Sequence, residues 1–331
     1  MTATLPDRDT GVVAPDAPTA ASPTGSPTAS PAGSPATSPP ARPVKAPEPR
    51  LPRPGDDLWT VVSTAGTMVA IVCLWVVGQM LFLSGFSENR SQELLYREFR
   101  VSVAGATAPI GPTTPVGDPV ATLRIPRLGL FQVVVEGTAS GDTLAGPGHL
   151  RKTVLPGQAG TSVVFGRAAT YGGPFRDLGE LRPGDDIDVV MAQGEVHFTV
   201  VNVRRTSTPY SQPLPAGGAR LILATAEGSG PLASLSPGSV VYVDADAPRG
   251  FVPPSGLPAT VPDPEQIMHS DHGAFPLLAL HLALLLAATL GVVVARQRWS
   301  APLVWIVAAP VAVALAWSTT DVVMRLLPNV V

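Results

Sequence analysis

The sequence holds few side chains that could act as a nucleophile, a general base or a metal ligand. Cys73 is the only cysteine among the 331 residues, and it lies in an apolar run, where we predict a small membrane-buried side chain. It permits neither an internal disulfide nor a cysteine-rich metal site. A nucleophilic thiol needs a neighbouring base to activate it. No cysteine lies outside this apolar run, so the rest of the chain has no candidate for thiol chemistry.

The chain has five histidines, three of them between residues 269 and 281. His197 alternates with its neighbours and is predicted to pack or to face solvent on a strand. His269 and His272 fall in a predicted flexible linker, which disfavours a metal site there. His281 lies inside an apolar run, where an ionisable group is a functional candidate by default, but we favour a neutral, hydrogen-bonded histidine near the interface. No metal ion and no cofactor is predicted.

Composition favours a membrane protein with polar segments over one large soluble enzyme. Only 14% of the residues are charged, and the mean hydropathy is +0.27. The net charge is −3, and the chain lacks the basic stripe that phosphate binding requires, which argues against nucleic acid as a partner. The preference for Arg over Lys, with abundant Ala, Val and Pro, is typical of a high-GC actinobacterium.

The N-terminal part is predicted to be a tail followed by a membrane anchor. Residues 1–57 should form a disordered tail, because Ser-Pro pairs recur at every fourth position in part of it and little can be buried. Residues 58–83 carry no charge and exceed the ~20 residues that cross a bilayer. Four basic residues before this run place the tail in the cytoplasm and the next domain outside the cell: Arg42, Lys45, Arg50 and Arg53.

Three further helices are expected. Residues 87–104 combine apolar and charged positions near helical spacing, which predicts a juxtamembrane amphipathic helix. Residues 275–295 and 301–320 are apolar runs that predict two C-terminal transmembrane helices, with Arg296 and Arg298 in a cytoplasmic connection. The chain is therefore predicted to be a multi-pass cell-membrane protein with three spans.

The middle of the chain has a different pattern. Between residues 115 and 247, short valine-rich runs are separated by Gly and Pro turns, and helical periodicity is almost absent. Seven or eight such strands predict an all-β fold, a compact antiparallel or mixed β-barrel, rather than an α/β fold. Residues 248–273 follow as a linker.

Four segments of this middle domain, taken in order, resemble the sortase family, and the class E type in particular. They are "LRIPRLGLFQVVVEGT" (123–138), "AGPGHLRKTVLPGQAGTSVVFG" (145–166), "TYGGPFRDLGELRPGDDI" (170–187) and "LILAT" (221–225). The resemblance implies an eight-stranded sortase-type β-barrel outside the membrane, anchored by the first span.

The resemblance also implies three catalytic roles. Sortases cut a sorting signal of the LPXTG type after its threonine, through a thioacyl intermediate on a cysteine, and pass the acyl group to an amine. A histidine in a "GHR" motif, a cysteine that ends a "TTC"-like strand and an arginine on the last strand carry this chemistry. The matching positions here hold Arg167, Ala226 and, to within a residue or two, Ser239. His149 matches a position that the family does not use in catalysis, and we predict a loop or barrel-edge residue.

Because all three roles are substituted, we expect a catalytically degenerate member, a pseudo-sortase without catalytic residues. The first functional hypothesis is a cell-surface module that binds a sorting-signal-like peptide or a surface protein. Its expected groove lies near Tyr171, Pro174, Phe175, Thr225 and Glu227. The second hypothesis is a scaffold for an active sortase or its substrates.

The third hypothesis is a cysteine-independent transpeptidase or hydrolase. Thr225 and Ser229 flank the nucleophile position, but a hydroxyl nucleophile needs a neighbouring base, and none is visible. A further expectation concerns the charge left in the old cleft. Arg167 stands at one substituted position and Glu227 follows another, Ala226, so we predict that Arg167 and Glu227 form a salt bridge.

Overall fold

The structure, a computed structural model, describes residues 70, 73–79, 83–111, 113–205, 207–227 and 239–331. The predicted tail (residues 1–57) and most of the predicted first span (residues 58–83) lie outside the described residues. Both stay predictions.

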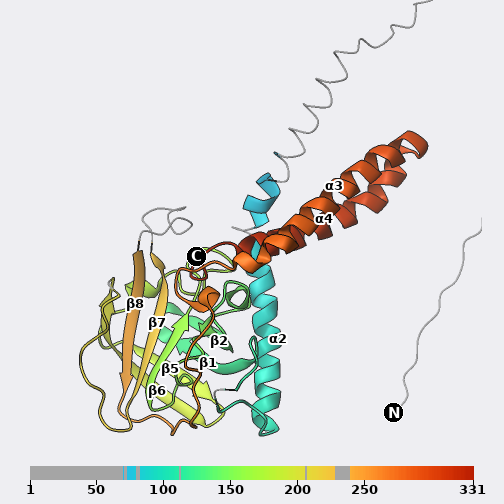
Figure 1. The fold of residues 1–331 in the computed structure, drawn as a ribbon. Coiled ribbons are helices and arrows are strands. Elements are labelled where there is room, and N and C mark those ends of the chain that lie inside the picture. Colours follow the sequence, from blue (N-terminus) through green and yellow to red (C-terminus); the bar gives the residue numbers. More distant parts are fainter. Residues whose placement is uncertain (1–69, 71–72, 80–82, 112, 206, 228–238) are drawn as a thin grey trace, which may run out of the picture. The chain divides into compact units, whose positions relative to one another are not determined.

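Eight strands close into one barrel (Figure 1). They are β1 (Pro119–Ile125), β2 (Leu130–Glu136), β3 (Gly148–His149), β4 (Gly160–Phe165), β5 (Asp186–Met191), β6 (Gly194–Arg204), β7 (Ala219–Glu227) and β8 (Ser239–Ala247). The order around the barrel is β1-β2-β3-β4-β7-β8-β6-β5, and β5 pairs with β1 to close it. The predicted eight-stranded β-barrel is confirmed.

Alternation of side chains explains the closed core. In β5, Ile187, Val189 and Met191 are buried, and the residues between them are partly or fully exposed. β6 continues the pattern with buried Val196 and Phe198. Successive side chains of a strand point to opposite faces, so β5 and the first part of β6 contribute every second residue to the interior.

Two of the neighbouring strand pairs are parallel, and one of them positions the candidate site. β4 runs parallel to β7, with Phe165 opposite Ala224. The carboxyl ends of parallel strands lie at the same edge of a sheet. The residues that follow β4 and the last residues of β7 therefore lie side by side.

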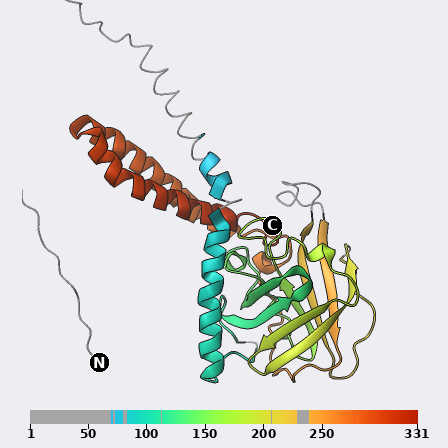
Figure 2. The same ribbon diagram turned by 180° about the vertical axis from the view of Figure 1, so that it is seen from behind.

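Helix α2 (Ser84–Ala104) lies along the barrel beside β1 and β2 (Figure 2), where the sequence predicted a helix over residues 87–104. Gln92 attaches it to β2: its Oε1 accepts a hydrogen bond from the Val133 N–H (2.6 Å), and its Nε2 donates to the Val133 carbonyl (3.1 Å). Tyr96 packs edge-on against Phe131. The side-chain amide thus takes the place of a strand partner at this position of β2.

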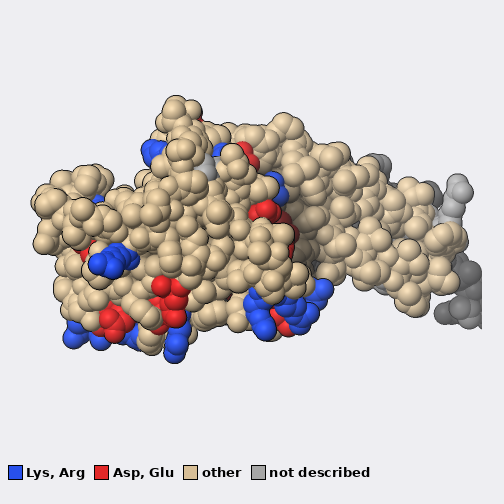
Figure 3. Space-filling view, turned by 90° about the horizontal axis from the view of Figure 1, so that it is seen from below, with Lys and Arg blue, Asp and Glu red and all other residues tan. Residues whose placement is uncertain are grey.

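Helices α3 (Phe275–Arg298) and α4 (Ala301–Arg325) pack against each other (Figure 1). Residues His272–Val292 and Pro302–Arg325 are long and apolar enough to cross a membrane. The paired helices present an almost uncharged surface (Figure 3). The two predicted C-terminal helices are thus present as candidate spans, while the three-span topology and its orientation stay predictions.

The segment between β8 and α3 is more structured than a flexible linker. It contains the short helices η6 (Asp263–Glu265) and η7 (His272–Ala274). The Asp271 N–H donates to the Arg325 carbonyl at the end of α4 (2.9 Å). Glu265 is buried and pairs with Arg151, whose Nε lies 2.9 Å from Glu265 Oε2. These contacts bind residues 263–272 to the barrel and to the end of α4.

Candidate functional site

The positions of Arg167 and Ala226 lie at the ends of the parallel strands β4 and β7. The Gly166 N–H donates to the Ala224 carbonyl (3.0 Å), which continues the strand ladder by one residue. The Thr225 hydroxyl donates to the Gly166 carbonyl (2.8 Å). The structure therefore brings together the two positions that the sequence singled out.

Arg167 is fully buried and is held by neutral groups. Its Nη2 donates to the Ser140 carbonyl (2.7 Å) and to the Ser140 hydroxyl (2.8 Å), and its Nη1 donates to the Thr170 hydroxyl (2.9 Å). Its Nε has no hydrogen-bond partner among the described residues. The guanidinium carbon lies 5.9 Å from the centroid of the Tyr171 ring, at cation–π distance.

Burial lowers the pKa of the Arg167 guanidinium to about 10, and Tyr171 acts in the opposite direction. At neutral pH the group is therefore a buried cation. It donates hydrogen bonds but has no free lone pair with which to accept a proton. At this position the side chain can organise the loop, and it cannot serve as a general base.

The predicted salt bridge between Arg167 and Glu227 is wrong. Glu227 instead binds Arg205, whose Nε lies 2.6 Å from Oε2 and whose Nη2 lies 2.8 Å from Oε1. Ser239, the approximate position of the family's arginine, pairs with Glu227 across β7 and β8. Sequence reasoning missed Arg205, because it follows β6 and no local pattern links it to the end of β7.

The residues expected to line a groove are largely buried. Phe175 has no exposed surface and belongs to the barrel core. Thr225 is 2% exposed and Tyr171 4% exposed, and Pro174 is half-buried. The Tyr171 hydroxyl hydrogen-bonds to Asp321 of α4, and burial raises the pKa of this phenol. In this arrangement the site is filled rather than open.

Residues 326–331 fill the site. The Val330 carbonyl accepts hydrogen bonds from two backbone N–H groups, those of Ala168 (3.1 Å) and Ala226 (3.3 Å). A backbone oxygen of Val331 accepts a hydrogen bond from the Thr170 hydroxyl (2.8 Å). Val330 and Val331 are fully buried in a cluster with Ala168 and Ala226. Sequence reasoning had assigned no role to this segment.

Asn329 fixes the segment from the other side. Its Nδ2 donates to the Thr138 carbonyl (2.7 Å) and to the Gln266 carbonyl (2.9 Å), and its Oδ1 accepts from the Met268 N–H (3.0 Å). The Thr143 hydroxyl donates to the Asn329 carbonyl (3.0 Å). Every polar atom of this buried side chain is hydrogen-bonded, as a buried amide requires.

His149 is a structural residue of β3 rather than part of this site. It is buried, with Nδ1 2.9 Å from Glu136 Oε2 and Nε2 2.9 Å from the Val154 carbonyl. The sequence predicted a loop or barrel-edge residue. The structure places the histidine on a two-residue strand, with both ring nitrogens engaged. Those contacts pin the chain between β3 and β4 to the barrel.

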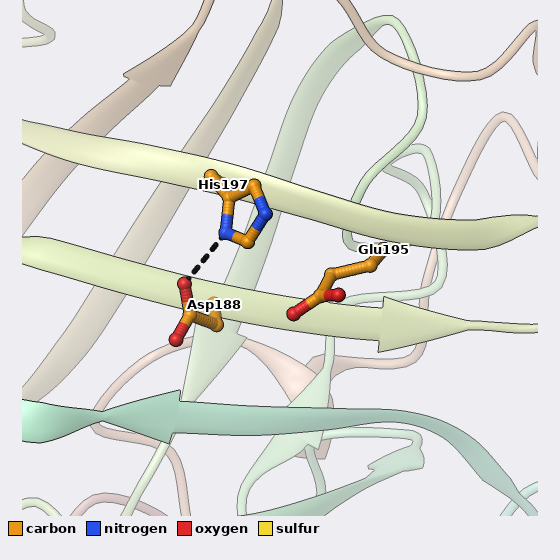
Figure 4. A group of neighbouring side chains, drawn as sticks. All are labelled: Asp188, Glu195 and His197. Carbon is orange, nitrogen blue, oxygen red and sulfur yellow. Dashed lines mark hydrogen bonds and ion pairs between the residues drawn. The ribbon is translucent and has the colours of Figure 1, made fainter.

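Asp188, Glu195 and His197 form the described group of residues that could approach a metal ion (Figure 4). One ligand atom from each lies within 4.8 Å of the others. His197 faces solvent from β6 and its Nδ1 lies 2.8 Å from Asp188 Oδ1 across the β5–β6 pair. This hydrogen bond raises the pKa of His197. Because Nδ1 is already engaged and the group is exposed, the geometry is that of a surface ion pair.

The rings of the other histidines contact residues near them in the sequence, and the His269 carbonyl accepts a hydrogen bond from the Asn329 N–H (3.1 Å). His269 Nδ1 is 3.1 Å from the Ile267 carbonyl, and the His272 ring packs against Phe275. His281 Nδ1 is 2.8 Å from the Leu277 carbonyl one helical turn earlier. Each is engaged locally, as expected of residues without a shared ligand.

Comparison with known proteins agrees with the barrel. Residues 123–228 match the family described as "Sortase domain". Over 82 residues the chain is 32% identical to Sortase D of Bacillus subtilis (strain 168), a match that covers 25% of this chain and 40% of that protein. The match therefore spans less than half the length of this curated relative.

Solved sortase structures also align with the chain. A Clostridium perfringens Sortase D5 transpeptidase aligns at 17% identity with a TM-score of 0.38, over 48% of this chain and 96% of that one. The SrtF sortase from Corynebacterium diphtheriae aligns at 22% identity with a TM-score of 0.36, over 46% of this chain and 94% of that one. Sortase E1 from Streptomyces coelicolor, solved with a tripeptide in its active site, aligns at 25% identity with a TM-score of 0.34. The alignment covers 40% of this chain and 88% of that one. By the family match, residues 123–228 are similar to a sortase domain, and the rest of the chain lies outside the matched region.

Proposed function

We propose that this protein is a membrane-attached pseudo-sortase that binds extended peptides at the barrel without cleaving them. The supporting observation is the pair of residues at the end of β4 and β7. Arg167 and Ala226 stand where the family resemblance implies a histidine and a cysteine. The Val330 carbonyl accepts hydrogen bonds from the N–H of Ala226 and from the N–H of Ala168, the residue after Arg167. A site that holds a carbonyl with backbone donors but offers neither thiol nor base can bind a peptide and leaves its bonds intact.

The described hydroxyl candidate does not replace the thiol. Thr225 is buried, and its hydroxyl donates a hydrogen bond to the Gly166 carbonyl. No histidine or carboxylate hydrogen-bonds to its oxygen among the described residues. Ser229 lies outside the described residues. A hydroxyl nucleophile needs a base to take its proton, so the geometry around Thr225 favours binding over chemistry.

Membrane attachment completes the proposal. The two apolar helices α3 and α4 are candidate spans, and with residues 58–83 they would make three. The N-terminal tail is then cytoplasmic and the barrel extracellular, where sorting-signal-like peptides and cell-surface proteins are accessible. An active sortase in the same membrane is a second class of partner.

Peptide titration of the full chain in lipid nanodiscs tests the binding function. Fluorescent LPXTG-type and LAXTG-type peptides are titrated to millimolar concentration, with scrambled peptides as controls. Because residues 326–331 fill the site, a chain that ends at Arg325 is titrated in parallel. Saturable binding to either chain supports the proposal. A flat titration with both folded chains supports the scaffold hypothesis, which the filled site also favours.

A turnover assay tests the absence of chemistry. The same two chains are incubated with a quenched sorting-signal substrate, with and without hydroxylamine, which intercepts acyl-enzymes. We expect no cleavage. Turnover that disappears in Thr225→Ala or in Ser229→Ala would instead establish a cysteine-independent enzyme.

A further inference from the structure

The ends of β4 and β7 already hold a peptide segment of this chain, residues 330 and 331. Two backbone N–H groups, from Ala168 after β4 and from Ala226 in β7, point at the Val330 carbonyl oxygen. Paired backbone donors on one carbonyl oxygen are the arrangement that acyl-transfer enzymes use at the bond they break. Ala226 stands at the nucleophile position, so the Val330 carbonyl lies where a bond to be cleaved would lie.

The sequence of the segment leads to the same residue. Residues 327–331 read Leu-Pro-Asn-Val-Val, which matches the first two positions of an LPXTG-type signal and allows any residue at the third. In that register Val330 stands at the threonine, whose carbonyl is the one attacked, and Val331 stands at the glycine. The hydrogen bonds and the sequence spacing therefore both indicate Val330 as the residue at the position of the threonine.

We propose that residues 327–331 form an intramolecular pseudosubstrate that occupies the peptide site of this barrel. This inference rests on the proposed binding function and names the ligand class, an extended Leu-Pro-Xaa-Val or Leu-Pro-Xaa-Thr segment. Valine has nearly the shape of threonine without its hydroxyl, and Val331 brings a bulky β-branched side chain to the position of a glycine. The segment thus fits the site and competes with external peptides.

Burial and hydrogen bonds hold the segment in place. Asn329, Val330 and Val331 have no exposed surface, and the Asn329 amide binds the Thr138 and Gln266 carbonyls. A tethered ligand acts at an effective concentration on the order of millimolar for a short linker. An external peptide of equal intrinsic affinity therefore has to reach a similar concentration to displace it.

The pseudosubstrate is attached to the membrane hairpin. It follows α4 directly, and the Ser140 hydroxyl lies 2.9 Å from the Met324 carbonyl and 2.8 Å from the Leu327 carbonyl. One hydroxyl thus spans the end of the helix and the start of the segment. Tyr171, beside the site, also bonds to Asp321 of α4. Movement of the end of α4 would withdraw the segment and open the site.

The experiment compares the full chain with Asn329→Ala in lipid nanodiscs. The substitution removes three side-chain hydrogen bonds and leaves the length of the segment unchanged. Asn89→Ala, at an exposed position of α2, is the matched control. A chain that ends at Arg325 is the second variant. The readouts are amide hydrogen exchange of residues 166–171 and 223–227, and binding of LPXTG-type and Leu-Pro-Asn-Val-Val peptides. Exchange of β5 and β6 reports whether each variant is folded.

We expect slow exchange at Ala168 and Ala226 in the full chain and in Asn89→Ala, and faster exchange in Asn329→Ala and the shortened chain. The apparent dissociation constant of both peptides should fall by roughly tenfold or more in these two variants. Equal exchange and equal affinity in all four chains would overturn the pseudosubstrate. Faster exchange without peptide binding to any chain would retain the intramolecular contact and remove the proposed peptide-binding function instead.

Discussion

Asp142 provides a sensitive test of the loop that holds residues 326–331. It begins the short helix η3 (Asp142–Leu144), next to Ser140 and Thr143, which both hydrogen-bond to that segment. Its Oδ2 accepts a hydrogen bond from the Ala139 N–H (3.1 Å). A Cβ on Gly137, whose φ is +100°, would lie 2.7 Å from the same oxygen. Only glycine at that position leaves room for the carboxylate.

Burial raises the pKa of Asp142 from 3.8 to about 6. The Ala139 N–H opposes this shift, Glu265 adds to it, and the cations of Arg151 and Arg325 oppose it. A raised carboxyl pKa means that the folded protein binds a proton more tightly than the unfolded chain. The free energy of unfolding therefore falls as pH rises from about 4 to about 6, and the full loss persists above that range.

The magnitude follows from this pKa. At 1.36 kcal/mol per pKa unit, the displacement corresponds to about 3 kcal/mol. Screening by solvent at a partly exposed side chain reduces this to about 1–2 kcal/mol. Asp142→Asn keeps an oxygen for the Ala139 N–H and removes the charge. We expect it to stabilise the protein by that amount at pH 7.5 and by almost nothing near pH 4.

Thermal unfolding of the full chain in detergent micelles, followed by fluorescence between pH 4 and pH 8, measures the effect. The Tm of Asp142→Asn should exceed that of the unsubstituted chain by about 2–8 °C at pH 7.5, with the difference closing toward pH 4. Asp177→Asn, at an exposed position, should show no such trend. A difference between Asp142→Asn and the unsubstituted chain that does not change with pH would refute the reasoning.

Two other substitutions probe the site directly. Gly166→Ala would place a Cβ 2.3 Å from a ring carbon of Phe175, so we expect the free energy of unfolding, measured with denaturant, to fall by about 1–3 kcal/mol. The control Gly85→Ala makes only ordinary contacts and should be tolerated. Equal stability of the two variants would contradict this account. Ala226→Cys in a Cys73→Ala background should react slowly with maleimide, because position 226 is 4% exposed and reaction requires local opening. Removal of residues 326–331 should accelerate labelling, and fast labelling of the full-length variant would show that the segment leaves this position open.

The local patterns in the sequence were sufficient for most of the architecture. Alternating valines specify strands because successive side chains of an extended chain point to opposite faces, and ordered motifs between residues 123 and 225 identified the barrel before its strands were seen. The apolar runs of α3 and α4 identified candidate spans by length alone. The missing thiol was equally plain, because it is a property of residue identity.

Other features depend on how the barrel closes. Arg167 has Ser140 as its partner and Glu227 has Arg205, although adjacency to the degenerate positions had suggested that Arg167 and Glu227 pair with each other. Polar groups on several other strands and loops could serve as the partner of each of these side chains. The partner is the group that lies within hydrogen-bonding distance in the folded barrel, and local sequence does not encode that distance.

The filling of the site is the clearest case. The letters Leu-Pro-Asn-Val-Val are visible in the sequence, but any surface segment could carry them without meaning. Their significance comes from the contact between Asn329 and Thr138, which are 191 positions apart, and from the Val330 carbonyl held by Ala168 and Ala226. By itself the sequence determined that the site has no reactive thiol. Only the tertiary structure decided what occupies it, because side chains and backbone donors from distant segments meet there only after the chain has folded.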